Sequence, residues 1–90
     1  SVFIKPGISF NGNTANCTVS VTGNTMSDDI EVVVKLWQGN SCLVTWNTSG
    51  IGYVNFSKSR TVSDGVVYTL TADVTINGIK QPTASISSRS

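Results

Sequence analysis

Apolar and polar residues alternate along residues 64–79, and this alternation is the clearest structural signal in the chain. Every second residue from Tyr68 to Ile76 is apolar, whereas the residues between them are threonines and Asp73. A period of two is typical of a strand with one face in a core and the other in water. The run ends at Asn77-Gly78, a dipeptide that favours a two-residue hairpin turn. The segment therefore predicts a long strand that closes in a hairpin.

Shorter runs of the same kind fill the rest of the chain, and turn signals separate them. The expected strands cover residues 2–10, 15–22, 30–37, 42–46, 53–62, 66–76 and 79–86. Pro6-Gly7 is expected to interrupt the first run, as in an edge strand that changes partner, and Pro82 marks the last run as an edge, because proline has no N–H to donate to a ladder. Seven short strands and no helical periodicity in ninety residues predict one domain, residues 1–90, that folds as an all-β antiparallel sandwich or small barrel.

A local motif connects this pattern with a known family. Asp64-x-x-x-Tyr68-x-Leu70 looks like the start of the sixth strand in immunoglobulin domains, where the tyrosine forms a tyrosine corner. The chain resembles the immunoglobulin-like or fibronectin-type sandwich. Leu70 stands where antibody domains carry a cysteine, and Val32 or Val34 stands near the position of their core tryptophan. The resemblance implies a seven-stranded immunoglobulin-like sandwich with a structural corner at Asp64 and Tyr68.

Several further segments point to a narrower group. These are the order of residues 8–12, a Val/Leu-rich third strand that ends in residues 37–41, Trp46 followed by Ser, Thr and Gly, and the late tyrosine. Together they make the chain similar to small secreted immunoglobulin-like domains of unknown function from Gram-positive gut bacteria. This resemblance implies an extracellular, non-enzymatic domain and assigns no functional residue.

The two cysteines, Cys17 and Cys42, are a candidate disulfide. Cys17 shares the parity of Val19, and Cys42 shares that of Val44, so both are expected to face the core at one end. An even cysteine count in a small all-β chain favours a disulfide and an oxidising compartment. Few Lys and Glu beside many Ser, Thr, Asn and Gly is also typical of secreted or extracellular surface domains. The alternative is a pair of buried free thiols in a cytosolic protein.

Composition argues against several classes of function. The net charge of +1 without a basic run leaves no electrostatic footprint for nucleic acid. No histidine is present, which excludes histidine-based triads, and no cofactor motif is found. Asp64 and Asp73, a conceivable carboxylate pair for sugar hydrolysis, have structural interpretations in the corner and on an outer face. No apolar stretch reaches the roughly 18 residues that a membrane helix requires, so no membrane insertion is expected.

The only acidic cluster is Asp28-Asp29-x-Glu31. Its carboxylates are of the type that binds calcium, but no glycine-spaced calcium loop accompanies them, and a solvated turn before a strand is the preferred interpretation. Two cysteines without histidine fall short of a zinc set, and no metal site is predicted.

A face around Trp37 is the candidate binding site. Trp37 has the outward parity of Val33, and outward residues of the neighbouring strands are expected beside it. The candidate face consists of Trp37, Val33, Leu43, Thr69 and Thr71. A flat aromatic ring among hydroxyls suits a sugar ring, and exposed apolar residues suit a protein contact. The alternative is that residues 38–41 cover Trp37 or that a bulge turns it inward.

Asn-x-Ser/Thr sequons occur at Asn16, Asn47 and Asn55, and they are glycan acceptors only in a eukaryotic secreted protein. These observations predict a secreted or cell-surface, non-enzymatic module with a structural or adhesive role in protein interaction, as a monomer or weak oligomer. A carbohydrate-binding module with an exposed aromatic face is the alternative, so the ligand is a protein or a glycan. A small hydrolase or inhibitor is the third hypothesis.

Overall fold

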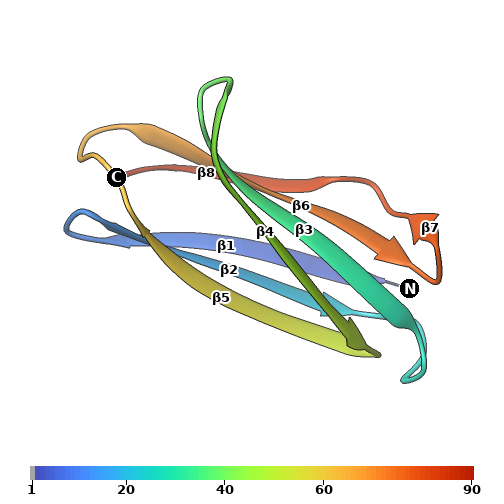
Figure 1. Ribbon diagram of the computed structural model, residues 1–90. Helices are drawn as coiled ribbons and strands as arrows, with labels where there is room; N and C mark the ends of the chain where they lie inside the picture. The colour runs from blue at the N-terminus through green and yellow to red at the C-terminus, as the bar shows by residue number, and fades with distance from the viewer. Residues whose placement is uncertain (1) are drawn as a thin grey trace.

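Two antiparallel sheets lie face to face in the computed structural model, which describes residues 2–90 (Figure 1). The first sheet has the order β1-β2-β5, and in the second β4, β3 and β6 follow one another while β7 and β8 both pair with β6. The strands are β1 (Phe3–Asn11), β2 (Thr14–Thr22), β3 (Asp29–Gln38), β4 (Ser41–Ile51), β5 (Tyr53–Thr61), β6 (Val67–Ile76), β7 (Ile79–Lys80) and β8 (Ala84–Arg89). The predicted all-β antiparallel sandwich is confirmed.

The central strands divide between the two sheets. The second and fifth strands share one sheet, and the third and sixth share the other. β4 lies beside β3 and not in the sheet of β5. The outer face of the second sheet therefore gains a strand, and the candidate binding residues are on this wider sheet.

The last predicted strand is in fact two strands. The run expected over residues 79–86 divides into β7 and β8, so residues 2–90 form eight strands where seven were predicted. Pro82 lies between them. It interrupts the strand because its ring fixes φ and it has no N–H to donate to the ladder. β8 then pairs with β6 from Ala72↔Ala84 to Val67↔Arg89.

Two further differences from the prediction concern the length of β4 and the continuity of β1. β4 continues five residues beyond Trp46. The prediction ended the strand at Trp46 because the later inward positions, Thr48 and Gly50, carry no hydrophobic signal. β1 is not interrupted at Pro6-Gly7, and its pairing with β2 runs unbroken from Phe3↔Thr22 to Asn11↔Thr14. An edge strand accommodates proline because one side of its ladder is unpaired.

The core forms between the inward faces of β2, β3 and β6. Its fully buried large side chains include Val19, Val21, Ile30, Val32, Val34, Leu36, Tyr68, Leu70 and Val74. Burial of each aliphatic side chain of this size contributes roughly 1.5–3 kcal/mol relative to exposure. The alternation seen in the sequence thus produces the core directly, since every second residue of these three strands is inward.

The Asn77-Gly78 hairpin has the expected turn geometry. Asn77 has φ 51° and Gly78 has φ 81°, and Ile76 pairs with Ile79 across the turn. Positive φ at both central residues is the requirement of a type I′ turn, which Asn-Gly meets with little strain. The predicted hairpin at the end of β6 is confirmed.

Tyr68 forms the predicted corner with the backbone five residues upstream. Its hydroxyl accepts a hydrogen bond from Ser63 N at 2.8 Å and donates to Ser63 O at 3.4 Å, while its ring is buried beside Phe10. Asp64 is exposed in the turn that follows Ser63. We call the end of the sandwich around Tyr68 and Ser63 the corner end.

Candidate functional site

Trp37 lies on the outer face of the second sheet, as its parity predicts. Its side chain is half-buried, and the indole Nε1 donates a hydrogen bond to Thr71 Oγ1 at 3.0 Å. Lys35 Nζ lies 5.9 Å from the ring centroid, within the range of a cation–π contact. The ring is therefore directed over β6 and is held by polar contacts on two sides.

The neighbouring residues of the predicted face are brought together only in part. Thr69 pairs with Trp37, and its Oγ1 is 2.7 Å from Ser87 Oγ of β8. Thr71 accepts the hydrogen bond from the indole. Val33 lies four residues before Trp37 on β3, opposite Asp73. Trp37, Thr69 and Thr71 thus form one cluster at the corner end of the outer face, with Val33 nearer its middle.

Leu43 does not belong to this face. Leu36 pairs with Val44 and Trp37 pairs with Cys42, so Leu43 is an extra residue in a β-bulge. Its side chain is half-buried and packs against the core. The expectation that Leu43 faces outward beside Trp37 is wrong, because a bulge breaks the alternation on which it rested.

The same bulge explains why the predicted disulfide is absent. Cys42 lies opposite Trp37 on the outer face, where it is exposed, and its Sγ is 3.6 Å from both Val44 O and Thr45 Oγ1. Cys17 is buried on the inward face of β2, and burial raises the pKa of its thiol to about 11. The two cysteines belong to different sheets, with the Cys17 thiol between the sheets and Cys42 on the outer face of the second sheet, and both are free.

Asp28, the first residue of the acidic cluster, is a structural residue of the loop between β2 and β3. Only 6% of its surface is exposed. Oδ1 accepts hydrogen bonds from Thr25 Oγ1 at 2.7 Å and Asn77 Nδ2 at 3.2 Å, and Oδ2 accepts from the backbone N–H groups of Asn24 at 2.8 Å and Thr25 at 3.1 Å. The hydrogen bonds from Thr25, followed by those from Asn77 and Asn24, lower the pKa of Asp28. This matches the turn interpretation of the cluster.

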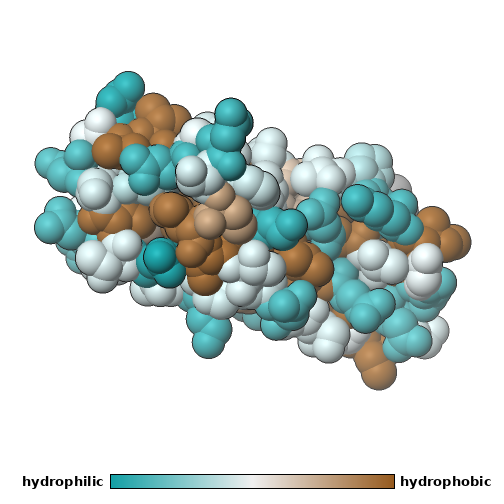
Figure 2. All heavy atoms as spheres, turned by 45° about the horizontal axis from the view of Figure 1, so that its top comes forward, coloured by the Kyte–Doolittle hydropathy of each residue, from teal (hydrophilic) through white to brown (hydrophobic). Residues whose placement is uncertain are grey.

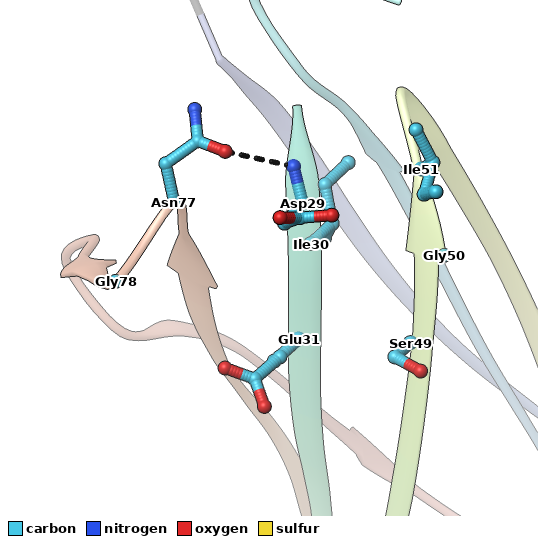
Figure 3. A pocket seen from close by; sticks show the side chains of 8 residues that line it. All are labelled: Asp29, Ile30, Glu31, Ser49, Gly50, Ile51, Asn77 and Gly78. Carbon is cyan, nitrogen blue, oxygen red and sulfur yellow. Dashed lines mark hydrogen bonds between the residues drawn. The ribbon is translucent and has the colours of Figure 1, made fainter. Parts of the chain in front are cut away.

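Asp28 stands where three connections meet, and we call this region the loop end. Gly52 N donates to Asp28 O at 2.8 Å, and Gly23 N donates to Gly52 O at 3.0 Å. Asn77 N donates to Asp29 O at 2.8 Å, and Asp29 N donates to Asn77 Oδ1 at 2.9 Å (Figure 3). The β2–β3 loop, the β4–β5 turn and the β6–β7 turn are therefore joined into one rigid surface.

Close packing explains two glycines of the loop end. A Cβ on Gly23 would lie 2.8 Å from Asp28 Oδ2, and one on Gly52 would lie 2.6 Å from Met26 O. Gly52 also has φ 75°, a conformation that other residues adopt at a cost. Both glycines let the backbone of one connection approach that of another.

A shallow groove follows β3 and β4 from the loop end along the outer face. Its first part has a volume of about 420 Å³ and is lined by Asp29, Ile30, Glu31, Ser49, Gly50, Ile51, Asn77 and Gly78 (Figure 3). A second hollow of about 240 Å³ adjoins it at Glu31 and Ser49 and extends to Val33 and Asn47. The groove thus begins at the Asn77 turn and ends at the middle of the face, away from Trp37.

Exposed apolar side chains gather at the loop end, and the sequence analysis did not identify them. We call Phe3, Met26, Ile51, Tyr53 and Ile79 the loop-end residues, and all five are exposed. Phe3 and Tyr53 flank Thr22 in adjacent strand pairs. Figure 2 shows hydrophobic patches, interrupted by hydrophilic residues, at the end where β7 lies in Figure 1 and also toward the other end of this face. A lone Met26 in a polar loop was the one signal in the sequence.

The remaining candidates have clear positions. Trp46 is half-buried against the core, with its ring 5.5 Å from that of Phe56. Of the sequon residues, Asn47 and Asn55 are exposed, whereas Asn16 is half-buried and accepts a hydrogen bond from Ser59 Oγ at 2.9 Å. Within residues 2–90 no helix is long and apolar enough to cross a membrane.

A scan against protein-family models finds no match, and a search of curated proteins finds no similar sequence.

Proposed function

We propose that the protein is a non-enzymatic module that binds another protein through its loop end. The observation that carries this proposal is the set of exposed loop-end residues around three hydrogen-bonded connections. Grouped apolar side chains with polar neighbours are typical of protein contact sites. Immunoglobulin-like sandwiches also present their loops at the two ends, where variable domains bind ligands.

Rigidity of the loop end supports the same function. Asp28 accepts four hydrogen bonds and connects the β2–β3 loop to Asn77, so the exposed side chains of Met26 and Ile51 are mounted on a fixed backbone. A surface that is ordered before binding loses less conformational entropy when a partner docks. We place this module at the cell surface or outside the cell. Its low charge and its Ser, Thr and Asn content support this location, whereas the free cysteines do not.

A selection of peptides on the immobilised domain tests the proposal. We expect apolar peptides to be enriched and to shift the amide resonances of Met26, Ile51 and Tyr53 in a titration followed by NMR. Met26→Ser with Ile51→Ser should abolish binding. Val67→Ser is the matched control, because Val67 is also exposed but lies at the corner end. Binding that survives the double substitution would reject the loop end as the site.

Carbohydrate binding is the second candidate, and the Trp37 cluster favours it. The indole lies beside the hydroxyls of Thr69 and Thr71, which is the combination that stacks on and hydrogen-bonds to a sugar. Lys35 lies over the ring and must move before a sugar can stack there. A glycan array with wild type and Trp37→Ala tests this candidate. If the wild type binds a glycan and the variant does not, carbohydrate binding replaces protein binding as the proposed function.

A further inference from the structure

β4 is an edge strand with a free ladder. It pairs with β3 on one side and has no strand on the other side of the second sheet. It is also 11 residues long. In an antiparallel sheet, alternate residues of such a strand direct N–H and C=O groups away from the sheet. β4 therefore offers a long row of main-chain donors and acceptors to another strand.

The other edges carry features that discourage pairing. β1 contains Pro6, and β8 is six residues long and follows Pro82. On β5, Lys58 and Arg60 are opposite the buried Cys17 and Ala15, yet both are exposed. Their side chains thus leave on the core side and emerge at the edge. Prolines, short edges and charges of this kind are the devices by which sheets avoid edge-to-edge association.

β4 has almost none of these devices. No charged residue occurs between Lys35 and Lys58, and no proline occurs in β4. Its bulge is confined to Leu43, which leaves Val44 to Ile51 in regular register with β3. The contrast with the other edges shows that β4 is the open edge of the sandwich.

The core is also incompletely covered along β4. Val44, Trp46 and Thr48 have inward parity but are only half-buried, whereas Val32 and Val34 of the adjacent β3 are 1% and 0% exposed. The Trp46 ring packs on Phe56 at this margin. A strand added beside β4 would extend the ladder and cover these side chains at the same time.

We propose that β4 pairs antiparallel with β4 of a second copy, so that two second sheets become one continuous sheet. β4 carries no charged residue, so pairing it with itself brings no like charges opposite one another. A two-fold axis matches the strand to itself and requires no other complementary surface. Antiparallel pairing sets the corner end of one copy against the loop end of the other. This keeps Lys58 and Arg60 of the two copies apart.

Sedimentation at concentrations from about 10 μM to about 1 mM tests the proposal, together with amide hydrogen exchange at both extremes. We expect a reversible dimer and slower exchange at high concentration confined to β4. Asn47→Lys places a charge on the exposed face of β4 and should weaken the dimer by about tenfold or more. Asn55→Lys is the matched control, since it makes the same change at an exposed position of the β5 edge and should leave the dimer intact.

Three results would overturn the proposal. The first is a wild-type protein that stays monomeric throughout the range. The second is a dimer that Asn47→Lys and Asn55→Lys weaken equally, and the third is a dimer whose added protection lies outside β4. Thr45→Lys serves as a second β4 variant, and the urea midpoint of each variant shows that it is folded.

Discussion

The two ends of the sandwich are each closed by one buried polar side chain, but by different chemistry. At the corner end, the neutral Tyr68 hydroxyl exchanges hydrogen bonds with Ser63, five residues away. At the loop end, the Asp28 carboxylate accepts four hydrogen bonds, one of them from Asn77, 49 residues away. The first closure is local and uncharged. The second is charged and connects distant parts of the chain.

This difference has a consequence for how each end responds to change. A local, neutral closure holds one turn against one strand, so its loss affects that turn. The Asp28 closure joins the β2–β3 loop to the β6–β7 turn, and Asp28 O also accepts from Gly52 N. We therefore expect the loop end to depend on a single ionised group, the Asp28 carboxylate.

The largest expected effect is the difference in alkylation rate between the two free thiols, of which one is buried and the other exposed. Under native conditions Cys42 should alkylate at least about 100-fold faster than Cys17, since Cys17 is buried and its pKa is raised to about 11. Intact mass against time, without reductant, measures this. A Cys42→Ser variant should take up no label while folded. No labelling of the wild type would point to a bond between the two cysteines.

Removal of the Asp28 carboxylate should cause the largest loss of stability among the closures. Asp28→Ala leaves four donors without their acceptor, so its urea midpoint should fall further than that of Tyr68→Phe. Asp29→Ala is the control, because Asp29 is the adjacent carboxylate and is exposed. Equal midpoints for the two variants would contradict a special role for Asp28.

Acid should weaken the loop end before the corner end. The pKa of Asp28 is lowered in the folded state, so its stabilising contribution is complete above the unfolded pKa of about 3.9. That contribution is lost as the pH falls through the lower, folded pKa. Urea midpoints between about pH 5 and pH 2 should therefore decline less steeply in Asp28→Asn than in wild type. Parallel curves for the two proteins would show that groups other than Asp28 determine the loss of stability at low pH.

Loss of the corner hydrogen bonds should cost less. Tyr68→Phe retains the buried ring and removes the hydroxyl that Ser63 contacts, which should lower the free energy of unfolding by about 1–2 kcal/mol. Tyr53→Phe is a matched control, since its side chain is exposed and the change should be near zero. An unchanged midpoint for Tyr68→Phe would remove the basis for the comparison between the ends.

The smallest effect is expected at Trp37. Trp37→Phe keeps an aromatic ring and loses the bond from Nε1 to Thr71 Oγ1, which should cost about 0.5–1 kcal/mol at this half-buried site. Thr71→Val removes the same bond from the other side, and a double-mutant cycle isolates it. A loss of about 3 kcal/mol or more would show that the indole completes the core instead of lying on the outer face.

The fold was predictable wherever alternation is regular. The parity of β2, β3 and β6 defined the core. The resemblance of Asp64-x-x-x-Tyr68-x-Leu70 to the immunoglobulin motif implied the corner, whose contact spans only five residues. Asp28 was interpreted only as a turn residue, since its partner Asn77 is distant in sequence. The apolar loop-end residues were missed because each is isolated in sequence and only the topology brings them to one end.

The extra residue at Leu43 reverses the order in which the residues of β4 alternate between the two faces of the sheet. On either side of it the rule of alternation holds, but the two phases are opposite, which is why Cys42 and Val44 face different sides of the sheet although they are two residues apart. Parity counted back from Val44 would therefore assign Ser41 and Cys42, the first two residues of this strand, to the wrong surface. A chain that lost Leu43 would keep Cys42 opposite Trp37 and would lose only the packing of this leucine side chain against the core.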